Sequence, residues 1–272
     1  MSVWILYDSP RYKRNVAFAH KLQTEFEKCG CAVRLIVDGR IPENEPLPDV
    51  AIMRFVDADL SKRLEGQGVR VVNNSCASRI CNDKWLSYQF VQSIGVPILP
   101  TKLVFKVDVL RETNPIVGFP KDWEYPVVLK SRFGHGGTEV FLADSPDALR
   151  DAFRKIPDDS AIIQKPASDL GKDVRVYILN GQILIAMLRE SKSDFRSNYC
   201  LGGTARQYLL NEEQQAVVKR ITDHLPLDFA GIDFIFDYGR IVFNEIEDVV
   251  GCRMIYSLTD LDPANLLAQK FC

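Results

Sequence analysis

The chain has 272 residues, with 34 lysines and arginines against 36 aspartates and glutamates, and a formal net charge of −2. Its content of 46% hydrophobic and 26% charged residues is typical of a globular protein with one large or two to three small packed units. The charge balance excludes the basic footprint of a nucleic-acid-binding protein. No apolar run approaches the roughly 20 residues of a membrane-spanning helix, so no membrane partner is expected.

The cysteines and the N-terminus indicate a cytoplasmic location. The seven cysteines are scattered without a CxxC pair, and the chain has only three histidines. A zinc site or a disulfide framework is therefore not expected, and the pattern suits a reducing compartment. Residues 1–8 lack the basic region and the cleavage site of a secretory signal.

The predicted elements of residues 1–77 alternate between strand and helix. Strands are expected at 3–7, 33–37, 49–55 and 69–73, with a helix at 12–29 and a short helix between the last two strands. This alternation predicts a small parallel sheet with helices on its faces. No GxGxxG follows the first strand, so a dinucleotide is not the expected ligand of this domain.

Two further units are expected, at residues 78–160 and 161–272. The second unit has a connecting helix at 78–94, strands at 102–105, 127–130 and 139–143, and a helix from Ser145 to Ile156 with Ser145 as N-cap and Pro146 at its first position. The third has strands at 161–164, 173–179 and 182–189, a helix at 212–224 and a hairpin of 231–237 with 241–247. The expected fold class is α/β and α+β.

The hairpin carries three carboxylates, Asp233, Glu245 and Glu247. Strand residues alternate faces, so Glu245 and Glu247 lie on the same side about 7 Å apart, where Asp233 can face them. Two carboxylates about 4 Å apart repel by roughly 4 kcal/mol at an effective dielectric constant near 20. The group therefore favours a cation, and Mg²⁺ with its preference for oxygen ligands fits best. A solvated hairpin edge with scattered acids is the alternative.

A glycine run, Gly134-His135-Gly136-Gly137, lies between two predicted strands. Glycines let backbone N–H groups approach anionic oxygens, although such turns are more often structural. The run is not a Walker A loop, because no Gly-Lys-Ser/Thr follows. Lys130 at the end of the preceding strand is a candidate phosphate ligand. A lysine that reaches from the strand end into solvent is the alternative.

Two polar clusters lie between the glycine run and the hairpin. Asp173 and Arg175 share one face of a strand, and a loop after the next strand carries Arg196 and Asn198 among further cations. Such a loop could bind a polyphosphate or a developing anion, and an exposed charged loop is the alternative.

The order of these segments resembles the ATP-grasp superfamily, and in particular its RimK-like branch, which ligates glutamate or related amino acids. The segments are Asn82-Asp83-Lys84, Lys130 with the glycine run, Gln164, Gly171-x-Asp173-x-Arg175, Asp194-Phe195-Arg196-Ser197-Asn198, Gly231-x-Asp233 and Glu245-x-Glu247. The resemblance covers roughly residues 78–250, and the Asp-Phe-Arg-Ser-Asn string is its most specific part. The first 77 residues are alike only in their alternating pattern.

The resemblance implies an ATP-grasp fold, with a Rossmann-like N-terminal domain and two α+β subdomains that grip ATP and Mg²⁺ or Mn²⁺. The implied ATP contacts are Lys84, Lys130, Gly134, Gly136, Gly137, the hinge Gln164-Lys165-Pro166, Asp173 near the ribose, Arg196, Ser197 and Asn198. The implied metal ligands are Asp233, Glu245 and Glu247. The implied catalytic residues are Arg189, Arg196 and Asn198, and Arg175, Asp248 and Arg253 are implied substrate contacts.

The implied reaction is an ADP-forming ligation of a carboxylate to an amine. The acid attacks the γ-phosphate to give an acyl phosphate, which the amine then attacks, and the substrates are an amino acid, a peptide or a protein tail. Metals and cations stabilise the spreading charge, so no Ser-His-Asp constellation is needed. An ATP-grasp kinase acting on a small molecule and a nucleotide-binding module without turnover stay open. The family also suggests a homodimer or homotetramer.

Two positions depart from the family pattern. Glu247 stands where the family has Asn, which keeps an oxygen ligand and adds a negative charge, and the altered turn after it is expected to bring Asp248 and Arg253 near the amine site. Lys165 replaces an acidic hinge residue and cannot accept a hydrogen bond from adenine, so backbone groups would have to read the base.

Three substitutions test these implied roles. Asp233→Asn or Glu245→Gln is expected to abolish magnesium-dependent activity with the fold intact. Arg196→Ala is expected to lower turnover more than ATP affinity.

Overall fold

The computed structural model describes residues 1–38, 46–111, 116–134, 136–191 and 203–272. The N-terminal unit is the predicted parallel sheet, in the order β2-β1-β3-β4. Its elements are β1 (Ser2–Tyr7), α1 (Ser9–Arg14), α2 (Val16–Lys28), β2 (Ala32–Val37), β3 (Val50–Met53), α3 (Ala58–Gly66) and β4 (Arg70–Val72). The single helix expected at 12–29 is wrong: α1 begins after its N-cap Asp8 and ends at Arg14, and Asn15 is both its C-cap and the N-cap of α2.

The connecting helix expected at 78–94 is also two helices, α4 (Ser75–Cys81) and α5 (Lys84–Ser93). The break occurs because the Asp83 carboxylate caps α5, accepting hydrogen bonds from the N–H groups of Trp85 and Leu86 at 3.0 and 3.2 Å. Lys84 is thereby the first residue of a helix rather than a mid-helix side chain.

The central unit is an antiparallel sheet in the order β5-β8-β6-β7, covered by two helices. Its elements are β5 (Thr101–Phe105), α6 (Lys106–Val109), β6 (Val127–Ser131), β7 (Val140–Ala143), α7 (Pro146–Arg154) and β8 (Ser160–Gln164). Ser145 caps α7 by accepting from the Ala148 N–H, with Pro146 first in the helix as expected. Because β8 pairs with β5 and β6, the strand expected to open the third unit belongs to the central one.

The C-terminal unit is a five-stranded antiparallel sheet in the order β11-β10-β9-β12-β13. Its elements are β9 (Asp169–Leu179), β10 (Gln182–Glu190), β11 (Thr204–Gln207), α8 (Glu212–His224), β12 (Phe229–Asp237), β13 (Arg240–Glu247), α9 (Arg253–Leu258) and α10 (Pro263–Phe271). The helix predicted at 212–224 has those bounds because Asn211 and Gln214 form a capping box at its start.

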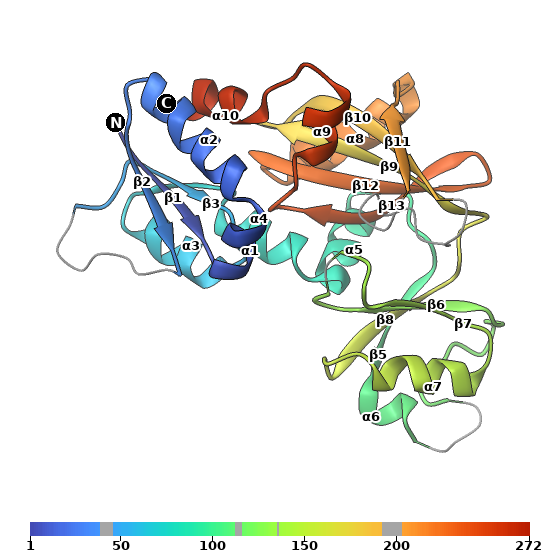
Figure 1. Ribbon diagram of the computed structural model, residues 1–272. Helices are drawn as coiled ribbons and strands as arrows, with labels where there is room; N and C mark the ends of the chain where they lie inside the picture. The colour runs from blue at the N-terminus through green and yellow to red at the C-terminus, as the bar shows by residue number, and fades with distance from the viewer. Residues whose placement is uncertain (39–45, 112–115, 135, 192–202) are drawn as a thin grey trace.

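The N-terminal and C-terminal units share one hydrophobic core. Buried side chains of the first sheet and of α2, such as Val3 and Phe26, pack in the same cluster as Phe229, Ile255 and Leu267. Helix α10 lies beside α2 (Figure 1). The central unit has a separate core, formed by residues between 104 and 163. The first and last units therefore form one body, to which the central unit is attached.

One disulfide, between Cys31 and Cys272, is present among the described residues. The scattered cysteines gave no sign of it, because the two residues are 241 positions apart and meet only when the ends of the chain pack together. In the described part of the chain, no helix has the length and apolar character to cross a membrane.

Candidate active site

Strand β13 presents three neighbouring polar side chains away from the core. Phe243 and Ile246 are buried in the core, at 0% and 2% exposure. Between them, Asn244 and Glu245 both line cavities, as does Glu247 beyond them. Two consecutive residues can share a face because the register of β13 with β12 shifts at this point. Strict alternation places Asn244 with the core, which is why the sequence did not single it out.

Each of these side chains lines a different cavity. The hinge cavity contains Asn244 and is lined by Leu99, Val128, Lys130, Val140, residues 164–167, residues 169–172 and Ile235. The lysine cavity contains Glu245 and is lined by Lys84, Lys130, Ser131, Gly134, Gly137, Glu139 and Val140. The arginine cavity contains Glu247 and is lined by Tyr7, Arg11, Arg14, Asn15, Arg54, Gly136, Arg175, Arg189, Val249, Gly251, Arg253 and Met254. The strand thus links three sites of different chemistry.

The hinge cavity offers apolar walls and a backbone edge. The Gln164 amide is not free, because it donates to the Tyr88 hydroxyl at 2.8 Å and to Thr101 Oγ1 at 2.9 Å. The Lys165 N–H donates to a carbonyl at Pro100, 3.0 Å away, and Pro166 has no N–H. The Lys165 ammonium lies 5.6 Å from the centroid of the Trp123 ring. Such a pocket suits a flat apolar ring with a polar edge.

The lysine cavity brings two cations, one from helix α5 and one from strand β6, to the glycine run. Lys84 Nζ donates to the Gly134 carbonyl and lies 3.8 Å from a Glu245 oxygen. Lys130 Nζ donates to Asn244 Oδ1 at 2.7 Å. Burial lowers the pKa of Lys130 to about 8, because the charge of Glu245 only partly offsets the loss of solvation. Two ammonium groups beside glycine backbone suit phosphate oxygens.

Gly134 is required by its close surroundings. Its N–H donates to Ser131 Oγ at 2.9 Å, and a Cβ added to it would lie 2.3 Å from a Glu139 oxygen and 2.9 Å from Ser131 Cβ. A larger residue would therefore require the glycine run or its neighbours to shift.

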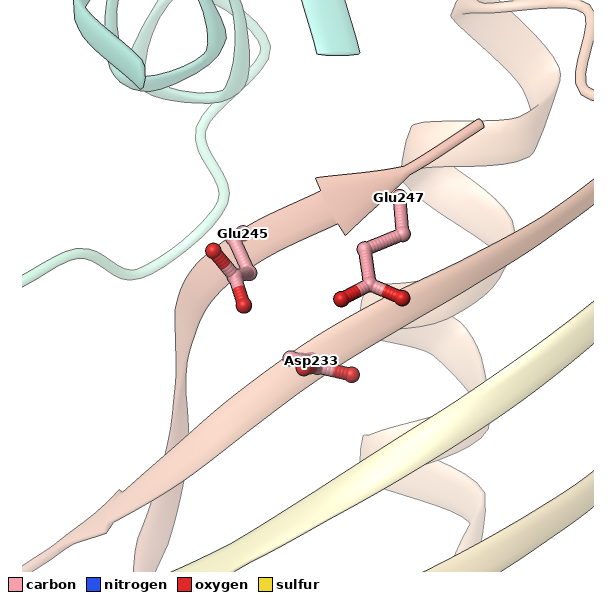
Figure 2. A group of neighbouring side chains, drawn as sticks. All are labelled: Asp233, Glu245 and Glu247. Carbon is pink, nitrogen blue, oxygen red and sulfur yellow. The ribbon is translucent and has the colours of Figure 1, made fainter. Parts of the chain in front are cut away.

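Figure 2 shows Asp233 on β12 and Glu245 and Glu247 on β13 turned toward one another. One carboxylate oxygen of each lies within 4.8 Å of the others. Asp233 accepts two hydrogen bonds from Arg175 and one from Arg189, each at 2.7 Å. Glu247 pairs with Arg175 at 2.9 Å. In the described part of the chain Glu245 accepts no hydrogen bond. Three carboxylates, one of them uncommitted, fit the oxygen-ligand preference of Mg²⁺.

These carboxylates end a row of alternating charges that crosses the sheet. Arg189 on β10 lies opposite Asp173 on β9, and Arg175 on β9 lies opposite Asp233 on β12. Arg189 donates twice to Asp173, each time at 2.6 Å. Burial opposes the charge on Asp233, but the charges and hydrogen bonds of both arginines outweigh it and hold its pKa at about 2. Burial raises the pKa of Glu247, with Arg175 opposing it.

Two expected ligand contacts lie elsewhere. Asp173, expected near a ribose, is 4% exposed and faces Arg189 across the strand pair instead of lining the hinge cavity. Asp248, expected near an amine acceptor, is 5% exposed and accepts a hydrogen bond from the Asn82 amide at 2.9 Å, outside the arginine cavity. In both cases the buried carboxylate accepts a hydrogen bond from a side chain in another segment of the chain.

The remaining expected residues divide between the cavities. The lysine cavity contains Lys84, Lys130, Gly134 and Gly137. The hinge cavity contains Gln164, Lys165 and Pro166. The arginine cavity contains Gly136, Arg175, Arg189 and Arg253. Arg196, Ser197 and Asn198 lie outside the described residues. Asn244 in the hinge cavity was not expected, and neither were the N-terminal residues of the arginine cavity, which include Tyr7 and Arg54.

Residues 81–270 match the sequence model of the RimK-like ATP-grasp domain. The chain belongs to the RimK-like ATP-grasp family. It is 31% identical to human N-acetylaspartylglutamate synthase A over 234 residues, which cover 82% of this chain and 59% of that protein. It is 26% identical to a probable alpha-L-glutamate ligase of Maridesulfovibrio salexigens, over 80% of this chain and 72% of that protein. The chain thus spans about three-fifths of the human synthase.

Solved structures support the same fold. The D-alanine–D-alanine ligase of Bacillus anthracis in complex with ATP superposes with a TM-score of 0.77 at 14% identity, covering 99% of this chain and 95% of that one. A RimK-domain ATP-grasp protein of Sphaerobacter thermophilus gives 0.72 at 18% identity, covering 99% and 98%. The expected fold class is confirmed. The order of the motifs predicted this family, and relatives of the chain are named as a synthase and as a probable ligase.

Proposed function

We propose that the ligase forms an acyl phosphate where its three cavities meet and then transfers the acyl group to an amine. ATP would occupy the hinge and lysine cavities, and the acid and the amine would occupy the arginine cavity. The arrangement of β13 carries this proposal, because its side chains line all three cavities in chain order. The names of the relatives, which include synthases of N-acetylaspartylglutamate and β-citrylglutamate, favour amino acid substrates.

The base of ATP would lie in the hinge cavity, read by backbone groups. Because Lys165 uses its N–H and Pro166 has none, the next donor is the N–H of Ala167, which has no hydrogen-bond partner in the described part of the chain. We assign the base contact to Ala167 on this ground. Lys130 and Lys84 would hold the phosphates, with the backbone of the glycine run covering them.

Asp233, Glu245 and Glu247 would hold Mg²⁺, or Mn²⁺ in its place. A bound ion would neutralise charge that develops on the transferring phosphoryl group. Glu245 is the most available ligand, since Asp233 and Glu247 already pair with arginines. The buried arginines hold those two carboxylates in position, so the ligand set is largely preformed.

The chemistry then proceeds in two steps. A carboxylate oxygen of the acid attacks the γ-phosphorus, the bond from that phosphorus to the bridging oxygen breaks, and ADP leaves. The amine nitrogen attacks the acyl carbon, and the carbon–oxygen bond to phosphate breaks to release inorganic phosphate, while the amine loses a proton to solvent. Arg189 lines the arginine cavity and is held by Asp173 and Asp233, so its charge is oriented toward the developing oxyanion. Arg196 and Asn198 stay predicted contacts at the same end.

Thermal unfolding with and without magnesium and ATP tests the nucleotide site. A ligand at about 100 times its dissociation constant stabilises the fold by about 2.7 kcal/mol, which is a shift of several degrees for a chain of this size. The shift should require magnesium and be lost in Glu245→Gln. Arg63→Gln on α3 is a matched control, because this exposed side chain has no hydrogen bond or ion pair in the described part of the chain.

Hydroxylamine in place of the amine separates the ligase from its alternatives. An acyl phosphate reacts with it to give a hydroxamate, so ADP and hydroxamate should form in equal amounts. A kinase acting on a hydroxyl would release ADP without hydroxamate. A binding module would show the melting shift without ADP.

A further inference from the structure

An arginine outside the three cavities joins the glycine run to helix α5. Arg132 directly follows β6 and precedes the run, and it lines none of the three cavities. Its Nε donates to Asp83 Oδ1 at 2.8 Å, and its Nη2 donates to Asp83 Oδ2 at 2.6 Å. The two side chains are 24% and 8% exposed. A planar guanidinium that meets both oxygens of a carboxylate fixes their relative orientation, and burial limits the screening of the two charges by salt.

The pair crosses the boundary between the central unit and the rest of the protein. The Asp83 carboxylate also accepts the hydrogen bonds from Trp85 and Leu86 that begin α5. Helix α5 packs through Tyr88 in the core of the C-terminal sheet. It is therefore part of the body formed by the N-terminal and C-terminal units, whereas Arg132 follows a strand of the central unit.

Two further hydrogen bonds connect the same segments. The Lys84 N–H donates to the Arg132 carbonyl at 3.0 Å, and Lys84 Nζ donates to the Gly134 carbonyl. The Arg132 guanidinium lies 5.0 Å from the centroid of the Phe133 ring, a cation–π contact that restrains the side chain further. The start of the glycine run is thereby held against the first turn of α5, next to the Lys84 ammonium.

We propose that Arg132 is a positioning residue for the nucleotide, whose pair with Asp83 holds the start of the glycine run at a fixed distance from Lys84. This inference rests on the proposed function, because it takes the lysine cavity as the phosphate site. Lys84 and Lys130 would touch the phosphates, whereas Arg132 would act only through the groups that it places.

Loss of the pair should affect the binding of ATP more than its reaction. Without the pair, the central unit would occupy the binding arrangement for a smaller fraction of the time, and the apparent affinity for ATP falls by that fraction. Bound ATP would contact both sides of the boundary, so saturating ATP would restore the arrangement. The KM for ATP should therefore rise while kcat changes little.

Substitution of the arginine tests this split. In Arg132→Gln the KM for ATP with magnesium should rise about tenfold, while kcat falls by less than about threefold. Arg132→Lys keeps the charge but loses the two-point contact, so it should recover part of the affinity. Arg154→Gln in the same unit is a matched control, because Arg154 is 57% exposed and pairs with Asp151 on its own helix. It should leave the KM unchanged.

Asp83→Asn separates the pair from the helix cap. Asparagine caps helices as well as aspartate does, and its amide oxygen can still accept from Trp85 and Leu86. Its NH₂ group would face the Arg132 Nη2 donor instead of accepting from it. Asp83→Asn should therefore raise the KM about as much as Arg132→Gln. The double variant should be no worse than either single variant, whereas independent effects would multiply to about a hundredfold.

Hydrogen exchange without nucleotide tests whether the pair holds the two segments together. The Lys84 amide, which donates to the Arg132 carbonyl, should lose about tenfold in protection in Arg132→Gln. The Val96 amide donates to the Val91 carbonyl within the body, at 2.9 Å, and should keep its protection. Equal loss at both amides would mean a general loss of stability and would overturn the positioning role.

The kinetic outcomes separate this role from the proposed function. An unchanged KM in Arg132→Gln overturns the role, as does a fall in kcat alone or a double variant whose effects multiply. A melting shift with magnesium and ATP that Arg132→Gln retains in full also overturns the role, and leaves the proposed function standing. Absence of that shift in the wild type would overturn both.

Discussion

Removing the carboxylate of Asp233 on β12 should lower the stability of the fold, and removing that of Glu245 on the neighbouring strand β13 should not. Asp233 is fully buried and accepts three hydrogen bonds from Arg175 and Arg189. In Asp233→Asn one oxygen becomes an NH₂ group, which faces arginine donors and cannot accept from them. Two buried guanidinium groups then lose a shared counter-charge. The sequence alone led us to expect an intact fold in this variant, whereas the contacts of Asp233 lead us to predict a less stable one.

The size of the effect follows from the burial of the pair. Removing one partner of a buried ion pair costs about 3–5 kcal/mol. At about 2 °C per kcal/mol, the low end for chains of this length, the melting temperature should fall by roughly 6–10 °C. Glu245 accepts no hydrogen bond among the described residues, its side chain is 24% exposed, and its nearest cation, Lys84, is 3.8 Å away. Glu245→Gln should therefore change stability by less than about 1 kcal/mol.

The assay is thermal unfolding of the wild type and both variants in EDTA, followed by ADP release with magnesium and ATP. Both variants should lose magnesium-dependent turnover, but only Asp233→Asn should lose stability. An Asp233→Asn protein that melts within 2 °C of the wild type would refute the view that this carboxylate anchors the arginines. A large drop for Glu245→Gln would instead show that Glu245 has a structural partner.

Three further predictions concern the nucleotide and the charge row. Asp173→Asn should lower kcat more than it raises the KM for ATP, because Asp173 holds Arg189 in place. A change in KM alone would instead support the original expectation that Asp173 binds the ribose. Because the pKa of Lys130 is lowered to about 8, its positive charge is lost as the pH rises through 8. The kcat/KM for ATP should therefore fall above pH 8 in the wild type and stay level to about pH 10 in Lys130→Arg. A level wild-type profile would contradict this prediction. Gly134→Ala should raise the KM for ATP at least several-fold, since its Cβ would meet Glu139 and Ser131, and unchanged ATP kinetics would exclude the run from the phosphate site.

The sequence predicted those parts of the site that depend on strand alternation and on short local motifs. The same-face positions of Glu245 and Glu247, with Asp233 opposite, follow from a two-residue period, and the structure has them within reach of one another. The Ser145 cap and the helix at 212–224 were also predicted, because both depend on neighbours along the chain. These features are set by neighbours along the chain.

The remaining parts of the site depend on breaks in the regular strand and helix patterns, or on contacts between segments that are distant in the sequence. A shift in the register of β13 with β12, which strand alternation does not predict, places Asn244 in the hinge cavity. The break before Lys84 depends on Asp83 acting as a cap within an otherwise helical pattern. Tyr7 at the end of β1 and Arg54 directly after β3 reach the arginine cavity, and only the shared core brings the first sheet against the last unit. No local signal in the sequence distinguishes such residues.

The shared core also bears on the order in which substrates bind. The hinge and lysine cavities have walls on both the central unit and the C-terminal sheet, so displacement of the central unit would take them apart. Apart from Gly136, the arginine cavity is walled by the N-terminal and C-terminal units, which pack as one body and are tied by the Cys31–Cys272 bond. An acid could therefore dock before the nucleotide arrives and stay through its exchange, which corresponds to random rather than compulsory addition in steady-state kinetics.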